Sequence, residues 1–196
     1  LLMQGFDTQA LAGMFYAPAY SAWLDGADHR ATCHHHKRIL QTLQGCYPAE
    51  RWLLKSPDHL AALDALLEVY PDACLIPLHR DPVQSVSSWA SLNAAFRGIW
   101  SQHIDAAELG RQVLERLATD MDASIDARRR LPADRFIDIQ YDDLIADPRA
   151  ELERIHAHFG LAFAPSTRQR VDDFLRADRE KKRSHAYAPE HFGLSA

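Results

Sequence analysis

The sequence predicts an α/β fold in which a parallel sheet is flanked by helices, and two observations support this. Between residues 51 and 96, short apolar runs alternate with segments whose apolar residues recur at helical spacing. Parallel strands need such helical connections, because a tight turn cannot join them. A third apolar run, at 135–141, extends the pattern. With 196 residues, 47% of them hydrophobic, residues 1–196 fit a single domain, or part of a larger one, with a buried core.

The N-terminal part reads as helices and loops. Residues 1–32 show no clean periodicity and indicate short helices with connecting loops. The spacing of Ile39, Leu40 and Leu43 predicts a helix over 33–44, which Gly45 would end.

The central part supplies the alternating pattern. Residues 51–55 are expected to form a short buried strand, followed by a helix that begins at Ser56-Pro57-Asp58 and ends near residue 70. A second strand is predicted over 73–79. The next helix runs to about residue 96, with Asp81 as its N-cap and Gln84 closing a capping box.

The C-terminal part continues with a long helix and a third strand. The helix has one apolar stripe of five residues, Leu109, Val113, Leu117, Met121 and Ile125. It ends in 128–130, three arginines that we interpret as solvated partners of the helix dipole. The third strand is predicted over 135–141, and two helices follow at about 147–159 and 167–177.

Composition excludes several classes of protein. There are 22 basic and 27 acidic residues, a formal charge of −5, which argues against nucleic acid as a partner. No apolar run approaches the roughly 20 residues of a membrane span, and the first residues lack the pattern of a signal peptide. We therefore expect a cytoplasmic protein without a membrane span, whose oligomeric state the sequence leaves open.

Cysteine and histidine spacing does not predict a metal site. Cys33, Cys46 and Cys74 are far apart and form no CxxC pair, so free thiols are expected. The histidines of the run 33–36 are consecutive, and neighbouring side chains point apart. We interpret that run as the polar start of a helix.

Reactive side chains follow the ends of the predicted strands, at Lys55-Ser56, at 79–81 and at 141–143. Ligands of open α/β sheets bind beyond these carboxyl ends. Arg80 leads into a capped helix, where free N–H groups and a bidentate guanidinium suit a phosphate; an ordinary salt bridge is the alternative reading of Arg80. Ser88, two turns into the helix, could add a donor.

The triplet His79-Arg80-Asp81 also occurs in the catalytic loop of protein kinases. A kinase needs Asn five residues after the Asp, where this chain has Val86, and it needs an Asp-Phe-Gly segment and a Gly-rich loop that are absent. The protein-kinase interpretation therefore fails.

In order, four segments resemble the sulfotransferases that use 3′-phosphoadenosine 5′-phosphosulfate (PAPS), and the bacterial branch most closely. They are Leu54-Lys55-Ser56-Pro57-x-His59-Leu60, then His79-Arg80-Asp81-Pro82 with Ser88, then Tyr141-Asp142-Asp143-Leu144, then the closing segment 181–194. The resemblance implies a fold like that of P-loop NTPases, with the donor's 3′-phosphate held by Arg80 and Ser88. It further implies that Tyr141 approaches the adenine and that Lys182 and Arg183 contact the nucleotide, although the family often has Gly where Arg183 stands.

The family's first motif, a Gly- and Ser/Thr-rich loop for the 5′-phosphosulfate, has no counterpart in residues 1–54. The chain is therefore expected to be the C-terminal part of a sulfotransferase domain, incomplete at its N-terminus and inactive alone.

The resemblance implies transfer of a sulfuryl group from PAPS to a hydroxyl or amine of an unidentified acceptor, without a metal. Lys55 would stabilise the sulfuryl or phosphate oxygens, with a surface lysine as the alternative. For the general base, His59, a residue outside this chain and His185 all stay open. Two other functions also stay open: a P-loop-type nucleotide kinase, and a non-catalytic or truncated sulfotransferase-like domain.

Overall fold

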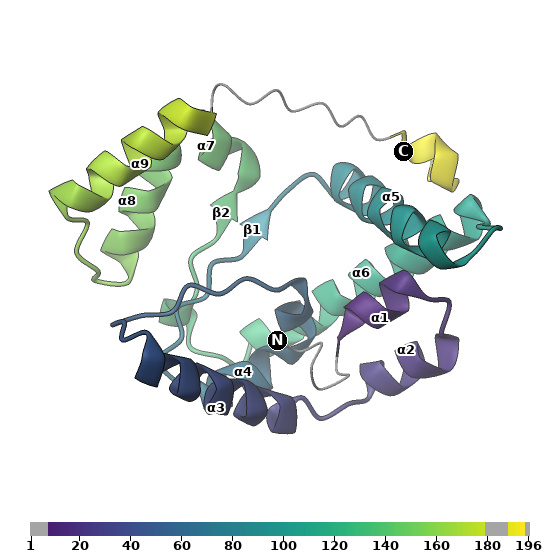
Figure 1. Cartoon of the computed structure of the whole chain (residues 1–196), viewed down its shortest axis with the longest axis horizontal. Coiled ribbons are helices and arrows are strands. Elements are labelled where there is room, and N and C mark those ends of the chain that lie inside the picture. The colour runs from purple at the N-terminus through teal and green to yellow at the C-terminus, as the bar shows by residue number, and fades with distance from the viewer. Residues whose placement is uncertain (1–7, 179–187, 195–196) are drawn as a thin grey trace.

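The computed structural model describes residues 8–178 and 188–194, and these form a helix-rich structure around a small sheet (Figure 1). The α-helices, in chain order, are α1 (Gln9–Met14), α2 (Pro18–Asp25), α3 (Arg30–Cys46), α4 (Leu63–Val69), α5 (Pro82–Trp100), α6 (Ala106–Arg128), α7 (Tyr141–Ala146), α8 (Pro148–His158) and α9 (Pro165–Asp178). Three short 3₁₀ helices accompany them, η2 (Pro57–Ala62), η3 (Ala133–Arg135) and η4 (Pro189–Phe192).

The sheet is parallel, as predicted. Strand β1 (Leu78–His79) pairs with β2 (Ile139–Gln140), with His79 opposite Gln140. A single parallel bridge between Leu75 and Phe136 precedes this pair. The two apolar runs at 73–79 and 135–141 therefore do lie side by side, although only a few of their residues form strand ladder.

The predicted strand at 51–55 is wrong for the described structure. These residues belong to no helix or strand, and Leu53 is 93% exposed. An apolar run becomes a strand only where its N–H and C=O groups find a neighbouring strand. Among the described residues, only the segments at β1 and β2 pair in this way.

Local capping explains where two central helices begin. The Ser56 hydroxyl accepts a hydrogen bond from the Asp58 N–H and starts η2, which passes into α4. The Asp81 carboxylate accepts from the Gln84 N–H at 2.8 Å and starts α5, as predicted. The reciprocal half of that capping box is not seen, because the Gln84 carboxamide accepts a hydrogen bond from Arg80 instead.

The prediction that a strand runs through 141 is also wrong, because Tyr141 is the first residue of α7. The strand ends at Gln140, and the acidic residues Asp142 and Asp143 then stand in the first turn of a helix, where its dipole favours them.

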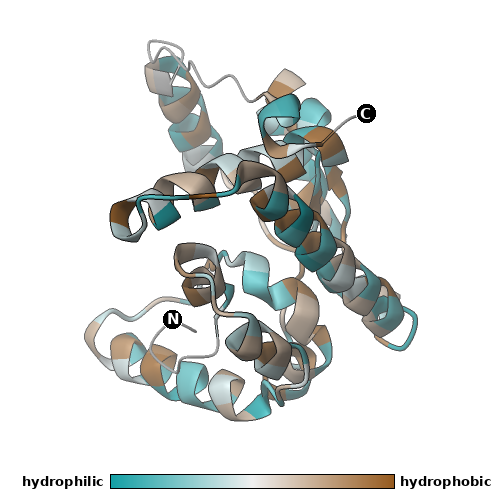
Figure 2. Ribbon diagram, turned by 90° about the vertical axis from the view of Figure 1, so that its right-hand side faces the viewer, coloured by the Kyte–Doolittle hydropathy of each residue, from teal (hydrophilic) through white to brown (hydrophobic). Residues whose placement is uncertain are grey.

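Three apolar clusters hold these elements together. The first packs α4 against α3 and the end of α6, around Leu66 and Phe136. The second packs α5 against α6 and η4, around Ala90 and Leu109. The third packs β2 against α8, around Ile139 and Ile155. Figure 2 shows that hydrophobic and hydrophilic residues alternate along the helices, as expected of amphipathic helices.

The buried face of α6 differs from its predicted stripe. Leu109 and Val113 are buried, but Met121 and Ile125 are each 43% exposed. Asp120 and Ser124 are buried in their place. This face turns toward α1 and α2, where polar side chains meet it, so apolar periodicity alone could not locate it.

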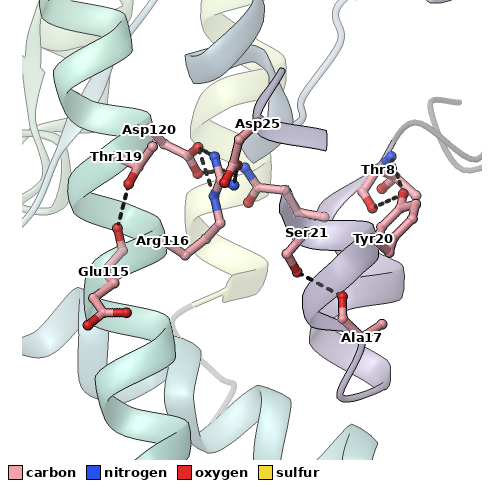
Figure 3. A network of polar contacts seen from close by, with 10 residues as sticks. Thr8, Ala17, Tyr20, Ser21, Asp25, Glu115, Arg116, Thr119 and Asp120 are labelled. Atoms are coloured by element: carbon pink, nitrogen blue, oxygen red, sulfur yellow. Dashed lines mark hydrogen bonds and ion pairs between the residues drawn. The ribbon is translucent and has the colours of Figure 1, made fainter. Parts of the chain in front are cut away.

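A network of polar side chains fastens α1 and α2 to α6 (Figure 3). Arg116 pairs with both Asp120 and Asp25, and the Gln9 amide donates to Asp120 at 2.5 Å. Thr8 caps α1 and donates through its hydroxyl to Asp58 at 2.9 Å, which links α1 to η2. The N-terminal helices are thus held against the segment that follows Lys55.

The arginines at the end of α6 form ion pairs. Arg128 pairs with Asp138, Arg129 with Asp126 and Arg130 with Asp64. Within the described ranges, no helix is both long and apolar enough to cross a membrane.

Candidate nucleotide site at the strand ends

The register of the sheet brings Arg80 and Tyr141 together. Because His79 lies opposite Gln140, the next residue of each chain segment leaves the sheet at the same edge. The guanidinium carbon of Arg80 lies 4.9 Å from the centre of the Tyr141 ring, a cation–π contact. Two residues predicted to bind one nucleotide, 61 positions apart in the sequence, therefore stand side by side.

Arg80 also stands at the positive end of α5. Its Nη2 donates to the Gln84 side-chain oxygen at 3.0 Å, and no carboxylate of the described residues pairs with it. The exposed guanidinium lies at the start of α5, where the helix dipole adds partial positive charge, although Pro82 has no N–H and the Gln84 N–H is bonded to Asp81. This arrangement suits an anion such as a phosphate.

Ser88 lies on the same helix, four residues beyond Gln84. The hydroxyls of its neighbours are occupied, since Ser85 donates to the Asp81 carbonyl and Ser87 to the Val83 carbonyl. The Ser88 hydroxyl has no such hydrogen bond within the described part of the chain, and its side chain is half-buried. Ser88 is therefore available to a ligand that reaches two turns along α5.

Next to Arg80 in the sequence, His79 belongs to a cluster of charged and polar side chains that the sequence did not predict. The His79 Nε2 is 2.6 Å from Asp138, which also receives two hydrogen bonds of 2.7 Å from Arg128. The Arg128 hydrogen bonds hold the pKa of the Asp138 carboxyl well below its usual range. His79 is 59 residues from Asp138 in the sequence, and only the strand pairing reveals their contact.

Lys55 and His59 are not joined to this site. Lys55 is exposed just before η2, and no hydrogen bond or ion pair within 8–178 and 188–194 connects it with Arg80. His59 is half-buried in η2, close enough to His36 for their charges to interact. Burial lowers the pKa of His59, so its imidazole is neutral at pH 7. The geometry therefore places His59 toward α3 and leaves its role as base a prediction.

The predicted contacts of Lys182 and Arg183, and the alternative base His185, lie outside the described residues.

The histidine run belongs to α3. His36 is buried, and its Nδ1 forms a 2.8 Å hydrogen bond with the Tyr70 hydroxyl. Burial lowers the pKa of His36 and raises that of Tyr70 to about 12. No disulfide joins Cys33, Cys46 and Cys74, which all lie within the described residues. Across the described ranges, no three His, Cys, Asp or Glu side chains gather as a metal site would require.

Comparison with known proteins places this geometry in a family. Residues 3–165 match the model of the Sulfotransferase family. Over 129 residues, the chain is 33% identical to omega-hydroxy-beta-dihydromenaquinone-9 sulfotransferase Stf3 of Mycobacterium bovis, and equally to that of Mycobacterium tuberculosis. The match covers 62% of this chain and 32% of each relative.

Solved structures agree. The crystal structure of sulfotransferase STF9 from Mycobacterium avium superposes with a TM-score of 0.89 at 30% identity, over 98% of this chain and 50% of that one. Sulfotransferase STF1 from Mycobacterium tuberculosis gives a TM-score of 0.83 at 29% identity, over 100% of this chain and 50% of that one. The chain thus spans about half the length of these solved relatives and a third of the curated ones. With the motif order, the paired strand ends and these matches in agreement, the chain belongs to the sulfotransferase family.

Proposed function

We propose that the protein transfers a sulfuryl group from PAPS to a hydroxyl or amine of an acceptor, and that this chain supplies the site for the donor's 3′-phosphate. The observation that carries the proposal is the Arg80 guanidinium, which lies beside Tyr141 at the start of α5 without a carboxylate partner among the described residues. Membership of the sulfotransferase family supports the reaction class.

In the proposed binding mode, Arg80 and Ser88 receive the 3′-phosphate. The guanidinium offers two parallel N–H groups, the α5 N-terminus adds partial positive charge, and the Ser88 hydroxyl adds a further donor. Tyr141 would lie near the adenine. Lys182 and Arg183 would contact the same nucleotide.

In the proposed reaction, the acceptor oxygen or nitrogen attacks sulfur in line with the bond to the 5′-phosphate. That S–O bond breaks as the new bond to sulfur forms, and adenosine 3′,5′-bisphosphate leaves. A base takes the acceptor's proton, and His59, neutral at pH 7, is the proposed residue within the described part of the chain. Lys55 would stabilise the developing charge on the sulfuryl or phosphate oxygens.

The acceptor is proposed by analogy alone. The curated relatives are named for a hydroxylated menaquinone, so an apolar molecule with a terminal hydroxyl is the first acceptor class to test.

Binding of adenosine 3′,5′-bisphosphate to the full-length gene product, measured by calorimetry without Mg²⁺, tests the donor site. We expect Arg80→Ala to weaken this binding about 10-fold or more, because a charge-assisted contact is lost. Arg129→Ala, which removes an exposed arginine of a surface ion pair, is the matched control and should leave the affinity unchanged. Unchanged affinity in Arg80→Ala would remove the assignment.

The same measurements separate the alternatives. Binding of ATP that requires Mg²⁺ would favour a nucleotide kinase. Binding of the bisphosphate without any sulfuryl transfer to a broad panel of acceptors would favour a non-catalytic domain.

A further inference from the structure

The Arg80 guanidinium is held from two directions by uncharged groups. The guanidinium carbon lies over the Tyr141 ring, 4.9 Å from the ring centre. The Gln84 side-chain oxygen accepts a hydrogen bond of 3.0 Å from Nη2. An exposed arginine without such contacts would sample many rotamers, and a ligand that binds it must fix the side chain at a cost in conformational entropy.

These two contacts leave the guanidinium able to bind an anion. A guanidinium has five N–H donors at its edge, and Gln84 takes one of them. Tyr141 contacts the guanidinium through its ring and accepts no hydrogen bond from Arg80 within the described residues. Neither partner carries a negative charge, so the full positive charge and a free pair of donors are available to a phosphate.

Arg128, the last residue of α6, shows what a structural arginine looks like beside the same sheet. It also lies on an aromatic ring, 4.8 Å from the centre of Phe136. Its two terminal nitrogens, however, both donate to the Asp138 carboxylate at 2.7 Å. The charge of Arg128 is therefore neutralised by a carboxylate, whereas Arg80 is held by neutral groups.

From this contrast we propose that Gln84 and Tyr141 are positioning residues, which hold the Arg80 guanidinium ready for the 3′-phosphate and so set the preference for 3′-phosphorylated nucleotides. The inference rests on the proposed donor site. It gives Gln84 a role, and it adds to Tyr141 a role that does not depend on contact with the adenine.

The test compares two ligands on the full-length gene product by calorimetry, adenosine 3′,5′-bisphosphate and 5′-AMP, which lacks the 3′-phosphate. We expect Gln84→Met and Tyr141→Leu each to weaken the bisphosphate about 3- to 10-fold, the size of one lost hydrogen bond or cation–π contact. Gln84→Met should change 5′-AMP binding less than about twofold, because 5′-AMP does not use Arg80. Tyr141→Leu should weaken 5′-AMP, which shares only the adenine contact, less than it weakens the bisphosphate. Tyr141→Phe keeps the ring and should restore the affinity for the bisphosphate.

Gln112→Met is the matched control, because Gln112 accepts a hydrogen bond from Arg97 at the same distance of 3.0 Å, away from the strand ends. It should leave both affinities unchanged. Gln84 is exposed, so its substitution does not disturb the core. Gln84→Glu tests the role of charge. The new carboxylate would neutralise Arg80 and weaken bisphosphate binding more than Gln84→Met does.

A double-mutant cycle separates positioning from direct contact. In the Arg80→Ala background, Gln84→Met should have no further effect on the bisphosphate, and Tyr141→Leu should weaken it no more than it weakens 5′-AMP. Equal losses for both nucleotides, or additive losses in this background, would overturn the inference while leaving the donor site intact. A wild-type protein that does not distinguish the two nucleotides would overturn the donor site and the inference with it.

Discussion

Burial changes the chemistry of two histidines, His36 and His59. Both lie between α3 and the segment that follows Lys55, and for both, loss of hydration is the main cause of the lowered pKa. The sequence places histidines at these positions but gives no sign of their burial, which depends on α3 packing over η2 and α4. The two imidazoles therefore lead to separate predictions, one for activity and one for stability.

For His59, we expect His59→Ala to reduce turnover by about 10²- to 10⁴-fold, the usual contribution of a general base, with bisphosphate affinity retained. Because the pKa of His59 is lowered, the acid limb of the wild-type kcat/KM profile should lie below the ordinary value of 6.5. His158→Gln, an exposed histidine of α8, is the control. Normal turnover of His59→Ala would exclude it as the base.

For His36, stability should fall in acid. In the unfolded chain this imidazole gains its proton near pH 6.5, whereas burial keeps it neutral in the folded protein to lower pH. The unfolded state therefore binds more protons as the pH falls through 6.5, and the stability present above that pH is progressively lost. Urea unfolding of wild type and His36→Gln between pH 7.5 and 5.5 measures the effect. A wild-type slope that the substitution leaves unchanged would assign the acid loss to other groups.

Among the elements, helix α6 gives the clearest case of a constraint that the sequence conceals. Gly110 is buried in α6, and a Cβ there would collide with the Phe192 carbonyl oxygen and approach the Phe192 side chain. Glycine has a low intrinsic helix propensity, so propensity alone does not explain its position within α6. The close packing of η4 against α6 explains it, because a larger residue would not fit there.

A pair of glycine substitutions tests this explanation. Gly110→Ala should lower the free energy of unfolding, because η4 must move away from α6, although alanine is the better helix former by about 1 kcal/mol. Gly45→Ala in α3, where a Cβ meets nothing within 4 Å, should raise it by up to about 1 kcal/mol. Thermal unfolding of the two variants should show shifts of opposite sign. Shifts of the same sign would show that η4 does not constrain α6.

The sequence predicts elements well where capping and periodicity agree. Asp81-Pro82 fixes the start of α5, and the apolar runs at 73–79 and 135–141 do pair in parallel. Prediction fails where a partner decides the outcome. Residues 51–55 have the composition of a strand without a neighbouring strand among the described residues, and Tyr141 turns into α7 although the preceding residues favour a strand.

The candidate site follows the same division. Arg80 and Ser88 are predictable, because their eight-residue spacing and the helix N-terminus are properties of the sequence. The contacts of Arg80 with Tyr141 and of His79 with Asp138 are not, since each depends on the register of β1 and β2. Gln84 looks like a capping residue in sequence, and its actual contact with Arg80 appears only in the structure.

At the scale of the whole molecule, polar contacts attach the N-terminal helices α1 and α2 to α6. The carboxylate of Asp120 is 2% exposed and is shared by Arg116 and Gln9 (Figure 3). Asp25 completes the network from α2. A buried ion pair of this kind contributes little relative to an apolar core, but removal of one partner leaves a charge without compensation.

We therefore expect Asp120→Ala to lower the free energy of unfolding by about 2–4 kcal/mol. Arg116 keeps Asp25 as a partner, which limits the loss. Asp173→Ala, which breaks the exposed pair with Arg176, is the control and should cost less than about 1 kcal/mol. Denaturant unfolding of both variants checks the difference, and equal losses would mean that the network adds nothing to attachment.

The uncovered segment 51–55 has a practical consequence for work with this chain in solution. Trp52, Leu53 and Leu54 are all exposed, and so is the thiol of Cys46, which precedes Trp52 by six residues in the sequence. Adjacent apolar side chains and an accessible thiol favour self-association and oxidative crosslinking. The isolated 196 residues should therefore elute at a size that grows with concentration and shrinks on addition of reductant. A Leu53→Lys, Cys46→Ser variant of the same 196 residues should elute at a size that depends on neither.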